Sequence, residues 1–201
     1  TYSYMLGRDA FQEADITGSI EPYSKHCYLI KNIEDIPRVF EEAFYIAGSG
    51  RPGPVLIDIP MDVQESKFDF EPCRQINIRG YKPSVKANHL QIKKAAEQIQ
   101  EAKAPLICAG GGVILSGAEN KLLKFAEKSG IPIVSTMMGI GSIDPNYSLY
   151  LGMIGTHGVK PANVALSHAD LVIIAGARVG DRAVAAPKQL QSRAKVIHID
   201  V

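Results

Sequence analysis

Hydrophobic positions first recur with helical spacing between residues 32 and 47. They stand three or four apart, which predicts a helix that buries one face: Ile36, Val39, Phe40, Ala43, Phe44 and Ala47. Asn32 is the predicted N-cap, and Gly48 the predicted glycine just beyond the last turn. The continuous apolar run that follows, residues 55–59, predicts a strand that is covered on both faces.

Helical and strand patterns alternate from residue 88 to the end of the chain. Ser116 and Glu119 have the spacing of a capping box, which predicts that a helix begins there and ends at Gly130. The other predicted helices are 89–102 and 161–168, and the predicted strands are 105–109, 131–136, 169–177 and 195–201. This alternation predicts an α/β fold with a doubly wound, Rossmann-like parallel sheet and flanking helices.

The pattern also divides the chain. Residues 61–88 carry scattered charges, two prolines and no clear period, which is typical of a connecting segment. We therefore predict the end of one α/β domain over residues 1–65, a linker over 66–87 and a second domain over 88–201. Both domains are expected to be incomplete, because the chain starts in a turn-like stretch and stops on a predicted strand.

Composition narrows the classes of function. The 22 Lys and Arg nearly balance the 21 Asp and Glu, so no strong field attracts nucleic acid or an anionic membrane. No apolar run approaches the ~20 residues of a membrane helix. The three cysteines are widely spaced and form no metal-binding pattern, which favours reduced thiols, a cytoplasmic location and no metal site in this chain.

Glycines gather soon after the predicted strands of the second domain. They lie at 110–112, at 139 and 141, within 152–158, and at 176 and 180. Ligands of open α/β sheets bind beyond the carboxyl ends of the strands, where glycine lets backbone N–H groups approach a phosphate. Tight turns also use glycine, and the spacing is neither GxGxxG nor a Walker A loop. Together the glycines favour a nucleotide-like ligand.

Several side chains near these glycines are candidate ligand contacts. Arg178 and Arg182 suit a phosphate or carboxylate, although a salt bridge to Asp170 or Asp181 is an equal alternative. His157 stands between glycines and is either a ligand contact or a structural hydrogen bonder. Methionines such as Met137 either flank a flat ring or fill the core.

At these motifs the sequence resembles the large, catalytic subunit of acetolactate synthase, a thiamine-diphosphate enzyme. The matching segments run in order along nearly the whole chain. They are RDAFQE at 8–13, YSKH at 23–26, SGRPGPVLIDIP at 49–60, AGGG at 109–112, TMMG at 136–139, LGMIGTHG at 151–158, GARVGDR at 176–182 and HID at 198–200.

The resemblance implies what each part does. Residues 1–65 would end a pyrimidine-binding domain, and residues from 88 would form most of an FAD-binding central domain. The thiamine-activating glutamate would precede Thr1, and the magnesium-binding diphosphate domain would follow Val201, so the chain alone is expected to be inactive. The family decarboxylates pyruvate on thiamine diphosphate and ligates the two-carbon unit to a second 2-keto acid, in branched-chain amino-acid biosynthesis. FAD is structural there.

The resemblance also assigns residues and partners. It implies that Gln12 contacts thiamine diphosphate, that Phe11 lines an active site shared across a dimer, and that Arg182 pairs with the carboxylate of the second substrate. The implied FAD contacts are Arg51, Gly111, Thr136, Met137, Ile154, Gly155, Thr156, His157, Gly176, Ala177, Arg178, Val179, Asp200 and Val201. The implied partners are 2-keto acids, a second copy in a homodimer or homotetramer, and a regulatory subunit.

Three positions depart from the family pattern. Met61 replaces a lysine near the substrate entrance, Thr156 replaces a methionine, and Gly180 stands where an aspartate is usual. Two alternatives therefore stay open: another thiamine-diphosphate-dependent 2-keto-acid decarboxylase or carboligase, and a nucleotide-binding module without catalysis.

Overall fold

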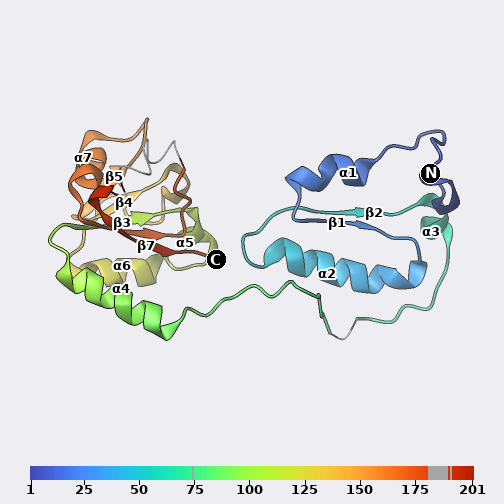
Figure 1. Cartoon of the computed structure of the whole chain (residues 1–201), viewed down its shortest axis with the longest axis horizontal. Coiled ribbons are helices and arrows are strands. Elements are labelled where there is room, and N and C mark those ends of the chain that lie inside the picture. Colours follow the sequence, from blue (N-terminus) through green and yellow to red (C-terminus); the bar gives the residue numbers. More distant parts are fainter. Residues whose placement is uncertain (74, 181–189, 191) are drawn as a thin grey trace. The chain divides into compact units, whose positions relative to one another are not determined.

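The computed structural model describes residues 1–73, 75–180, 190 and 192–201 (Figure 1). Contacts between residues divide the chain into two compact units, Thr1–Val85 and Lys86–Val201. None of the helices in these ranges is long and apolar enough to cross a membrane. Each unit is described by itself below.

The first unit is built on a two-stranded parallel sheet. Strands β1 (His26–Leu29) and β2 (Val55–Asp58) pair from His26 opposite Val55 to Leu29 opposite Asp58. Helix α2 (Ile36–Gly48) packs on this sheet and buries Val39, Ala43 and Ile46. The shorter elements are the 3-10 turns η1 (Ser3–Met5), η2 (Glu21–Tyr23) and η3 (Ile33–Asp35), and the helices α1 (Ile16–Ile20) and α3 (Met61–Glu65).

The second unit is a five-stranded parallel sheet with the order β5-β4-β3-β6-β7. Its strands are β3 (Pro105–Ala109), β4 (Ile133–Ser135), β5 (Tyr150–Met153), β6 (Leu171–Ala175) and β7 (Lys195–Ile199). Its helical elements are α4 (His89–Glu101), α5 (Gly111–Leu115), α6 (Glu119–Ser129), η4 (Met137–Gly139) and α7 (Lys160–His168). The predicted class, parallel sheets with flanking helices, is confirmed.

The core of the second unit lies on both faces of this sheet. Successive residues of a strand point to opposite faces, so Leu106 and Cys108 pack in the cluster that contains Ala162 of α7. Ile107 and Ala109 pack in the other cluster, which contains Ala126 of α6. All five residues of β6 are buried. Helices therefore cover both faces, as a doubly wound sheet requires (Figure 1).

Several predicted helix ends are wrong. The predicted capping box fails because the Ser116 hydroxyl donates to the carbonyls of Gly112 and Val113, so it closes α5 instead of opening α6. Asn32 precedes the 3-10 turn η3 and caps no N–H group. Gly48 is the last residue of α2, and the left-handed glycine is Gly50, with φ of 59°. Ser116 and Gly48 thus stand at the ends of α5 and α2, and the carbonyl of Asn32 accepts the N–H of Asp35 in the 3-10 turn.

The structure also contains elements that the pattern does not predict. Strand β1 has no predicted counterpart, because its four residues mix polar and apolar side chains that are mostly half-buried or exposed. The glycine segment at 110–112 leads at once into α5, and the segment at 152–158 starts inside β5. Short elements of four or five residues leave too few positions for a period to show.

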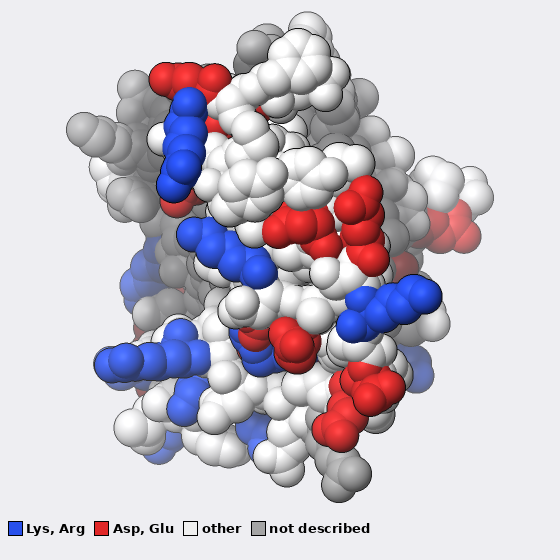
Figure 2. Space-filling model, turned by 90° about the vertical axis from the view of Figure 1, so that its right-hand side faces the viewer, with Lys and Arg blue, Asp and Glu red and all other residues white. Residues whose placement is uncertain are grey.

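Both signs of charge mix on the face of the molecule that Figure 2 shows. On the face of the molecule in Figure 2, acidic and basic side chains alternate, and the described residues there form no patch of one sign. Local pairs contribute, such as Arg38 with Asp35 at 2.8 Å. This mixing matches the near balance of charge along the chain.

Candidate functional site

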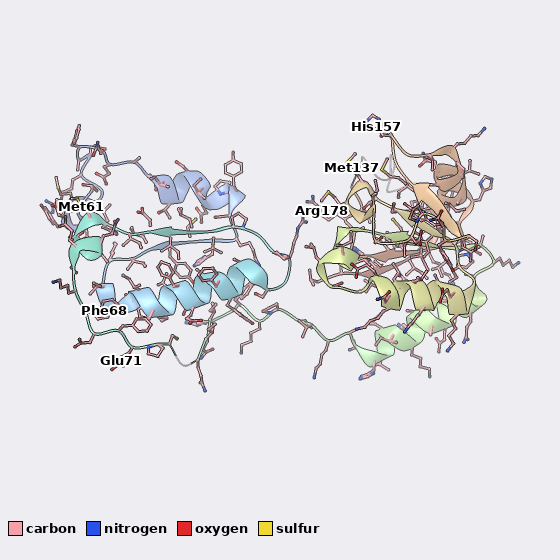
Figure 3. The ribbon with its side chains drawn as sticks, turned by 180° about the vertical axis from the view of Figure 1, so that it is seen from behind. Met61, Phe68, Glu71, Met137, His157 and Arg178 are labelled. Carbon is pink, nitrogen blue, oxygen red and sulfur yellow. The ribbon has the colours of Figure 1, made fainter. Side chains whose placement is uncertain are left out.

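The predicted contacts of the second unit lie just beyond the carboxyl ends of its strands. Gly111 follows β3, Met137 follows β4, residues 154–157 follow β5, residues 176–179 follow β6, and residues 200–201 follow β7. Because all five strands are parallel, their carboxyl ends meet at the same edge. Figure 3 shows Met137, His157 and Arg178 on the same side of this unit.

Backbone hydrogen bonds align the segments that follow the five strands. The N–H group of Ile154 donates to Ser135, and that of Thr136 donates to Ala109, both at 2.9 Å. In the same way, the N–H of Gly110 donates to Ala175 and that of Gly176 donates to Ile199, both at 2.8 Å. Each strand is therefore hydrogen-bonded to its neighbour at the point where it leaves the sheet. The segments that follow the five strands form one continuous border, which we call the rim.

The glycines of this rim are required by contacts between backbone segments. A Cβ at Gly112 would lie 2.7 Å from Cα of Gly176, and one at Gly176 would lie 2.7 Å from the carbonyl carbon of Gly112. A Cβ at Gly110 would clash with the carbonyl oxygen of Gly176, and one at Gly139 with that of Ala109. Close packing of one backbone segment on another accounts for these four glycines, which is a different reason from the tight turns that the sequence offered as the alternative.

The surface that this packing leaves outward is mixed in character. Met137, Thr156, His157, Arg178 and Val179 are exposed or partly exposed, as are the terminal residues Asp200 and Val201, while the Ile154 and Ala177 side chains are buried. Ile154 and Ala177 belong to the core, so only their backbone groups are available to a ligand.

Two side chains that the sequence analysis did not single out hold this rim. The Asn163 amide bonds both backbone groups of Gly155, at 2.9 and 3.0 Å. The His198 ring nitrogen Nε2 lies 2.8 Å from the carbonyl oxygen of Ala177. Asn163 stands two residues after a proline at a helix start, and this position is the only signal for it in the sequence.

Asp170 is not a partner of Arg178. It precedes β6, at the opposite end from Arg178, and its carboxylate accepts the N–H groups of Lys103 and Ala104 at 2.7 and 2.9 Å. These two hydrogen bonds, with the one from Lys103 first, hold the pKa of Asp170 below its usual range. Arg182 and Asp181 lie outside the described residues.

The exposed groups of the rim are of the kinds that bind nucleotides. Arg178 supplies a permanent cation and His157 an imidazole, both exposed and suited to phosphate. Met137, 64% exposed, offers a polarisable thioether to a flat ring. A Cβ at Gly111 would lie 3.0 Å from the Met138 carbonyl oxygen, so glycine there keeps α5 close to η4.

In the first unit, Phe11 and Gln12 lie on an exposed loop. Phe11 is 88% exposed, and Gln12 has a left-handed backbone with φ of 62°. The Glu13 carboxylate accepts the N–H groups of Gly7, Arg8 and Ala10, and these bonds, with that of Ala10 first, lower the pKa of Glu13. The loop is thus held from inside while both predicted contacts face outward.

Arg51 is exposed on the turn between α2 and β2. The Lys25 ammonium donates to the carbonyls of Ile46 and Ser49, at the end of α2, and to the Tyr81 hydroxyl at 3.0 Å. A positively charged donor at a helix C-terminus can bond the carbonyls that have no partner within the helix. The Lys25 stem also lies against Gly53, where a Cβ would be 3.0 Å from Cγ of Lys25. This cluster holds the turn that carries Arg51.

Within the ranges that the structure describes, no three His, Cys, Asp or Glu side chains are grouped to hold a metal ion. Among the described residues, one pocket of about 260 Å³ lies beside β1 and another of about 240 Å³ lies between α4 and β7. Neither is lined by a predicted site residue.

Comparisons with known proteins identify the family. The family model for "Thiamine pyrophosphate enzyme, central domain" matches residues 92–201. The chain is 46% identical to a probable acetolactate synthase large subunit of Methanocaldococcus jannaschii, over 98% of this chain and 34% of the relative. It is 45% identical to an acetolactate synthase of Arthrospira platensis and 44% identical to the acetolactate synthase large subunit of Corynebacterium glutamicum, over 98% and 99% of this chain and 35% and 32% of those relatives.

The chain spans about a third of the length of the curated relatives it matches. The family match covers the whole sheet of the second unit, with its rim, and the similarity to acetolactate synthases extends through the first unit as well. The chain belongs to the thiamine pyrophosphate enzymes, with residues 92–201 matching their central domain, and it is similar along nearly its whole length to acetolactate synthase large subunits.

Proposed function

We propose that this chain is part of an acetolactate synthase, which decarboxylates pyruvate and ligates the two-carbon unit to a second 2-keto acid. The observation that carries the proposal is 44–46% identity to acetolactate synthases over at least 98% of the chain. The domain assignment follows from it: residues 1–65 as the end of a pyrimidine-binding domain, 66–87 as a linker and 88–201 as a central domain.

Thiamine diphosphate, bound with Mg²⁺, supplies the carbon nucleophile of this reaction. We assign Gln12 and Phe11 to its neighbourhood, because their loop presents an amide and an aromatic ring outward. Arg182 is assigned to the carboxylate of the second keto acid, since a guanidinium pairs with a carboxylate in two parallel hydrogen bonds. These three assignments rest on the resemblance of their motifs.

FAD is proposed as a structural cofactor at the rim of the five-stranded sheet. Gly111, Thr136, Met137, Arg178, Val179, Asp200 and Val201 would hold it, with residues 154–157 and the backbone of 176–177. Arg51 is assigned to FAD by the resemblance. The chemistry of the exposed groups supports this assignment, because a cation and an imidazole suit its phosphates and a thioether suits its ring.

The assembly and location follow from the relatives and the sequence. The relatives named "large subunit" support a regulatory partner, and we propose a homodimer or homotetramer of the catalytic chain. The three unpaired cysteines support a cytoplasmic location.

The test is an assay of the intact gene product with pyruvate, thiamine diphosphate, Mg²⁺ and FAD. Formation of acetolactate is expected. Decarboxylation that yields another product and no acetolactate would overturn the proposal in favour of a different 2-keto-acid carboligase. In a separate titration, Arg178→Ala should weaken FAD binding, while Lys128→Ala, on the surface of α6, should not.

A further inference from the structure

Residues 154–157 cannot all serve a ligand in the same way, because some of their backbone groups are already bonded. The N–H of Ile154 donates to Ser135, and its side chain is buried. The N–H of Gly155 donates to Oδ1 of Asn163 at 2.9 Å. The carbonyl of Gly155 accepts Nδ2 of Asn163 at 3.0 Å and the N–H of Gly158 at 2.9 Å. Thr156 and His157 are the exposed residues of the segment.

Asn163 is suited to this contact by its amide group. An amide carries one acceptor and donors on a planar head, so it can bond the N–H and the C=O of one residue at once, as a neighbouring strand would. It stands in the first turns of α7, which begins at Lys160 and is anchored by the buried Ala162. The amide thus links a packed helix to the loop that leaves β5.

The loop itself has a conformation that needs support. Gly155 has φ of 107°, a backbone that side chains rarely adopt. A Cβ at Gly158 would lie 2.5 Å from the Met153 carbonyl oxygen, so the chain folds back closely on itself. The N–H of Val159 donates to that carbonyl at 2.9 Å and closes the loop. Backbone bonds close the base of the loop, and Asn163 fixes Gly155 within it.

We infer that Asn163 is a positioning residue of the ligand site, which holds Gly155 by both backbone groups so that Thr156 and His157 meet the ligand. This rests on the FAD site proposed above, and it makes Thr156 and His157, rather than Gly155, the direct contacts of this loop. Thr156 is also one of the positions that depart from the family pattern, so the loop presents a hydroxyl where a thioether is usual.

The test compares Asn163→Ala and Asn163→Asp with the unaltered intact gene product. Asn120→Ala is the matched control, because Asn120 is an exposed asparagine on α6 in the same unit. FAD affinity is measured by the quenching of flavin fluorescence. Hydrogen exchange is measured on the peptide that covers residues 153–159, without FAD.

Loss of both amide bonds should raise the Kd for FAD roughly tenfold in Asn163→Ala. Asn163→Asp keeps the acceptor and loses the donor, so its Kd for FAD should lie between those of the unaltered protein and Asn163→Ala. Hydrogen exchange at 153–159 should become faster in both variants, because both lose a bond that holds Gly155. Because Asn163 acts through Thr156 and His157, Asn163→Ala should raise the Kd for FAD by a smaller factor when His157→Ala is already present than it does alone.

The outcomes separate the inference from the function on which it rests. Unchanged exchange at 153–159 would overturn the hold on Gly155, and faster exchange with unchanged FAD affinity would overturn the positioning role. Equal FAD binding by the unaltered protein and Asn163→Ala therefore refutes the inference alone. An unaltered protein that binds no FAD refutes the proposed cofactor, and the positioning role with it.

Discussion

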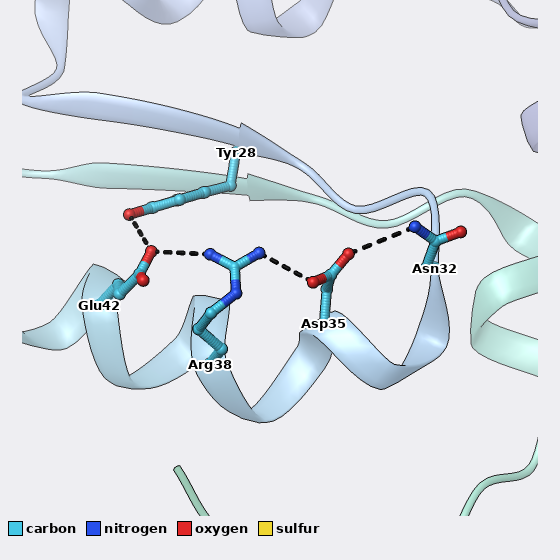
Figure 4. Close-up of polar contacts among 5 residues, drawn as sticks. All are labelled: Tyr28, Asn32, Asp35, Arg38 and Glu42. Carbon is cyan, nitrogen blue, oxygen red and sulfur yellow. Dashed lines mark hydrogen bonds and ion pairs between the residues drawn. The ribbon is translucent and has the colours of Figure 1, made fainter. Parts of the chain in front are cut away.

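The hydroxyl of Tyr28 donates to the carboxylate of Glu42 at 3.0 Å, which joins β1 to α2 inside the first unit (Figure 4). Glu42 is 8% exposed, and it also accepts Nη1 of Arg38 at 3.1 Å. Arg38 in turn donates to Asp35 and, as the principal cause, holds the pKa of Asp35 below its usual range. A carboxylate in the first unit is thus buried with both a neutral and a charged donor.

Glu42→Ala should destabilise the protein by about 1–3 kcal/mol, because it leaves the Tyr28 hydroxyl and the Arg38 guanidinium without their shared acceptor. Glu41→Ala is the control, since Glu41 is exposed one position earlier on the same helix. Its effect should stay within about 0.5 kcal/mol. Urea unfolding of both variants measures the difference, and equal effects would show that the Glu42 contacts contribute nothing.

Tyr28 should make stability fall at alkaline pH. Burial, followed by the hydrogen bond to Glu42, raises its pKa from 10.0 to about 12. Tyr28 therefore loses its proton at a lower pH in the unfolded chain than in the folded protein. Its contribution to the free energy of unfolding is complete below pH 10 and is lost as the pH rises towards 12. Unfolding midpoints in urea between pH 8 and pH 11 measure this loss. Tyr28→Phe should show a shallower decline, and a parallel decline would contradict the assignment.

Gly110→Ala should destabilise the second unit by about 3 kcal/mol or more, because its methyl group would clash with backbone that cannot move alone. Gly48→Ala provides the contrast. Gly48 is helical and nothing lies within 4 Å of its added Cβ, so alanine should stabilise α2 by about 0.5–1 kcal/mol. Thermal unfolding distinguishes the two, and a mild effect at Gly110 would mean that the exits from β3 and β6 can separate.

The three thiols should react in two classes. Burial raises the pKa of Cys108 to about 12, whereas Cys27 and Cys73 are partly exposed. At pH 8 a thiol reagent should therefore modify two cysteines in the folded protein and the third only after unfolding, because the thiolate is the reactive form. Mass spectrometry of the labelled peptides identifies them, and early labelling of Cys108 would show local opening of β3.

Lys25→Met should cost about 1.5–3 kcal/mol, because it removes charged hydrogen bonds at the end of α2 while keeping the stem over Gly53. Tyr81→Phe should cost less, because it removes hydrogen bonds of a hydroxyl and leaves the ammonium with both of its carbonyl acceptors. Lys25, followed by Ser49, lowers the pKa of the Tyr81 hydroxyl, so the phenol ionises more readily in the presence of the lysine. The control is Tyr23→Phe, at an exposed tyrosine. Urea unfolding measures the three variants. An equal loss of stability in Tyr23→Phe and Lys25→Met would contradict the role of the cluster.

The sequence was informative where elements are long or wholly apolar. Helices α2 and α4 and strands β3 and β6 were predicted within a few residues, because their periods extend over enough positions to show. Not every apolar residue of α4 is covered: Leu90 and Ile92 are 72% and 51% exposed, whereas Ile99 and Ala102 pack against the core. Periodicity shows that a face exists, and only packing decides which part of it is covered.

The position of the candidate site in the fold was predictable from the sequence, but the contacts that hold its backbone were not. Parallel strands force the residues after 109, 135, 153, 175 and 199 to one edge, so a positional rule was enough to gather them. The roles of Asn163, His198 and Lys25 depend on partners 8, 21 and 24 residues away, at Gly155, Ala177 and Ser49. Contacts of that kind are made by the folded chain, and no local spacing encodes them.

The interlocked glycines of the rim have a consequence for how such a protein diversifies. Gly110, Gly112 and Gly176 join the segments that follow β3 and β6 through main chain alone, so the framework of the proposed ligand site does not depend there on any outward side chain. Substitutions at outward positions such as 137, 156 and 178 can then accumulate without loosening the framework. The exposed residues of the rim can therefore change one at a time while these three glycines must stay glycine.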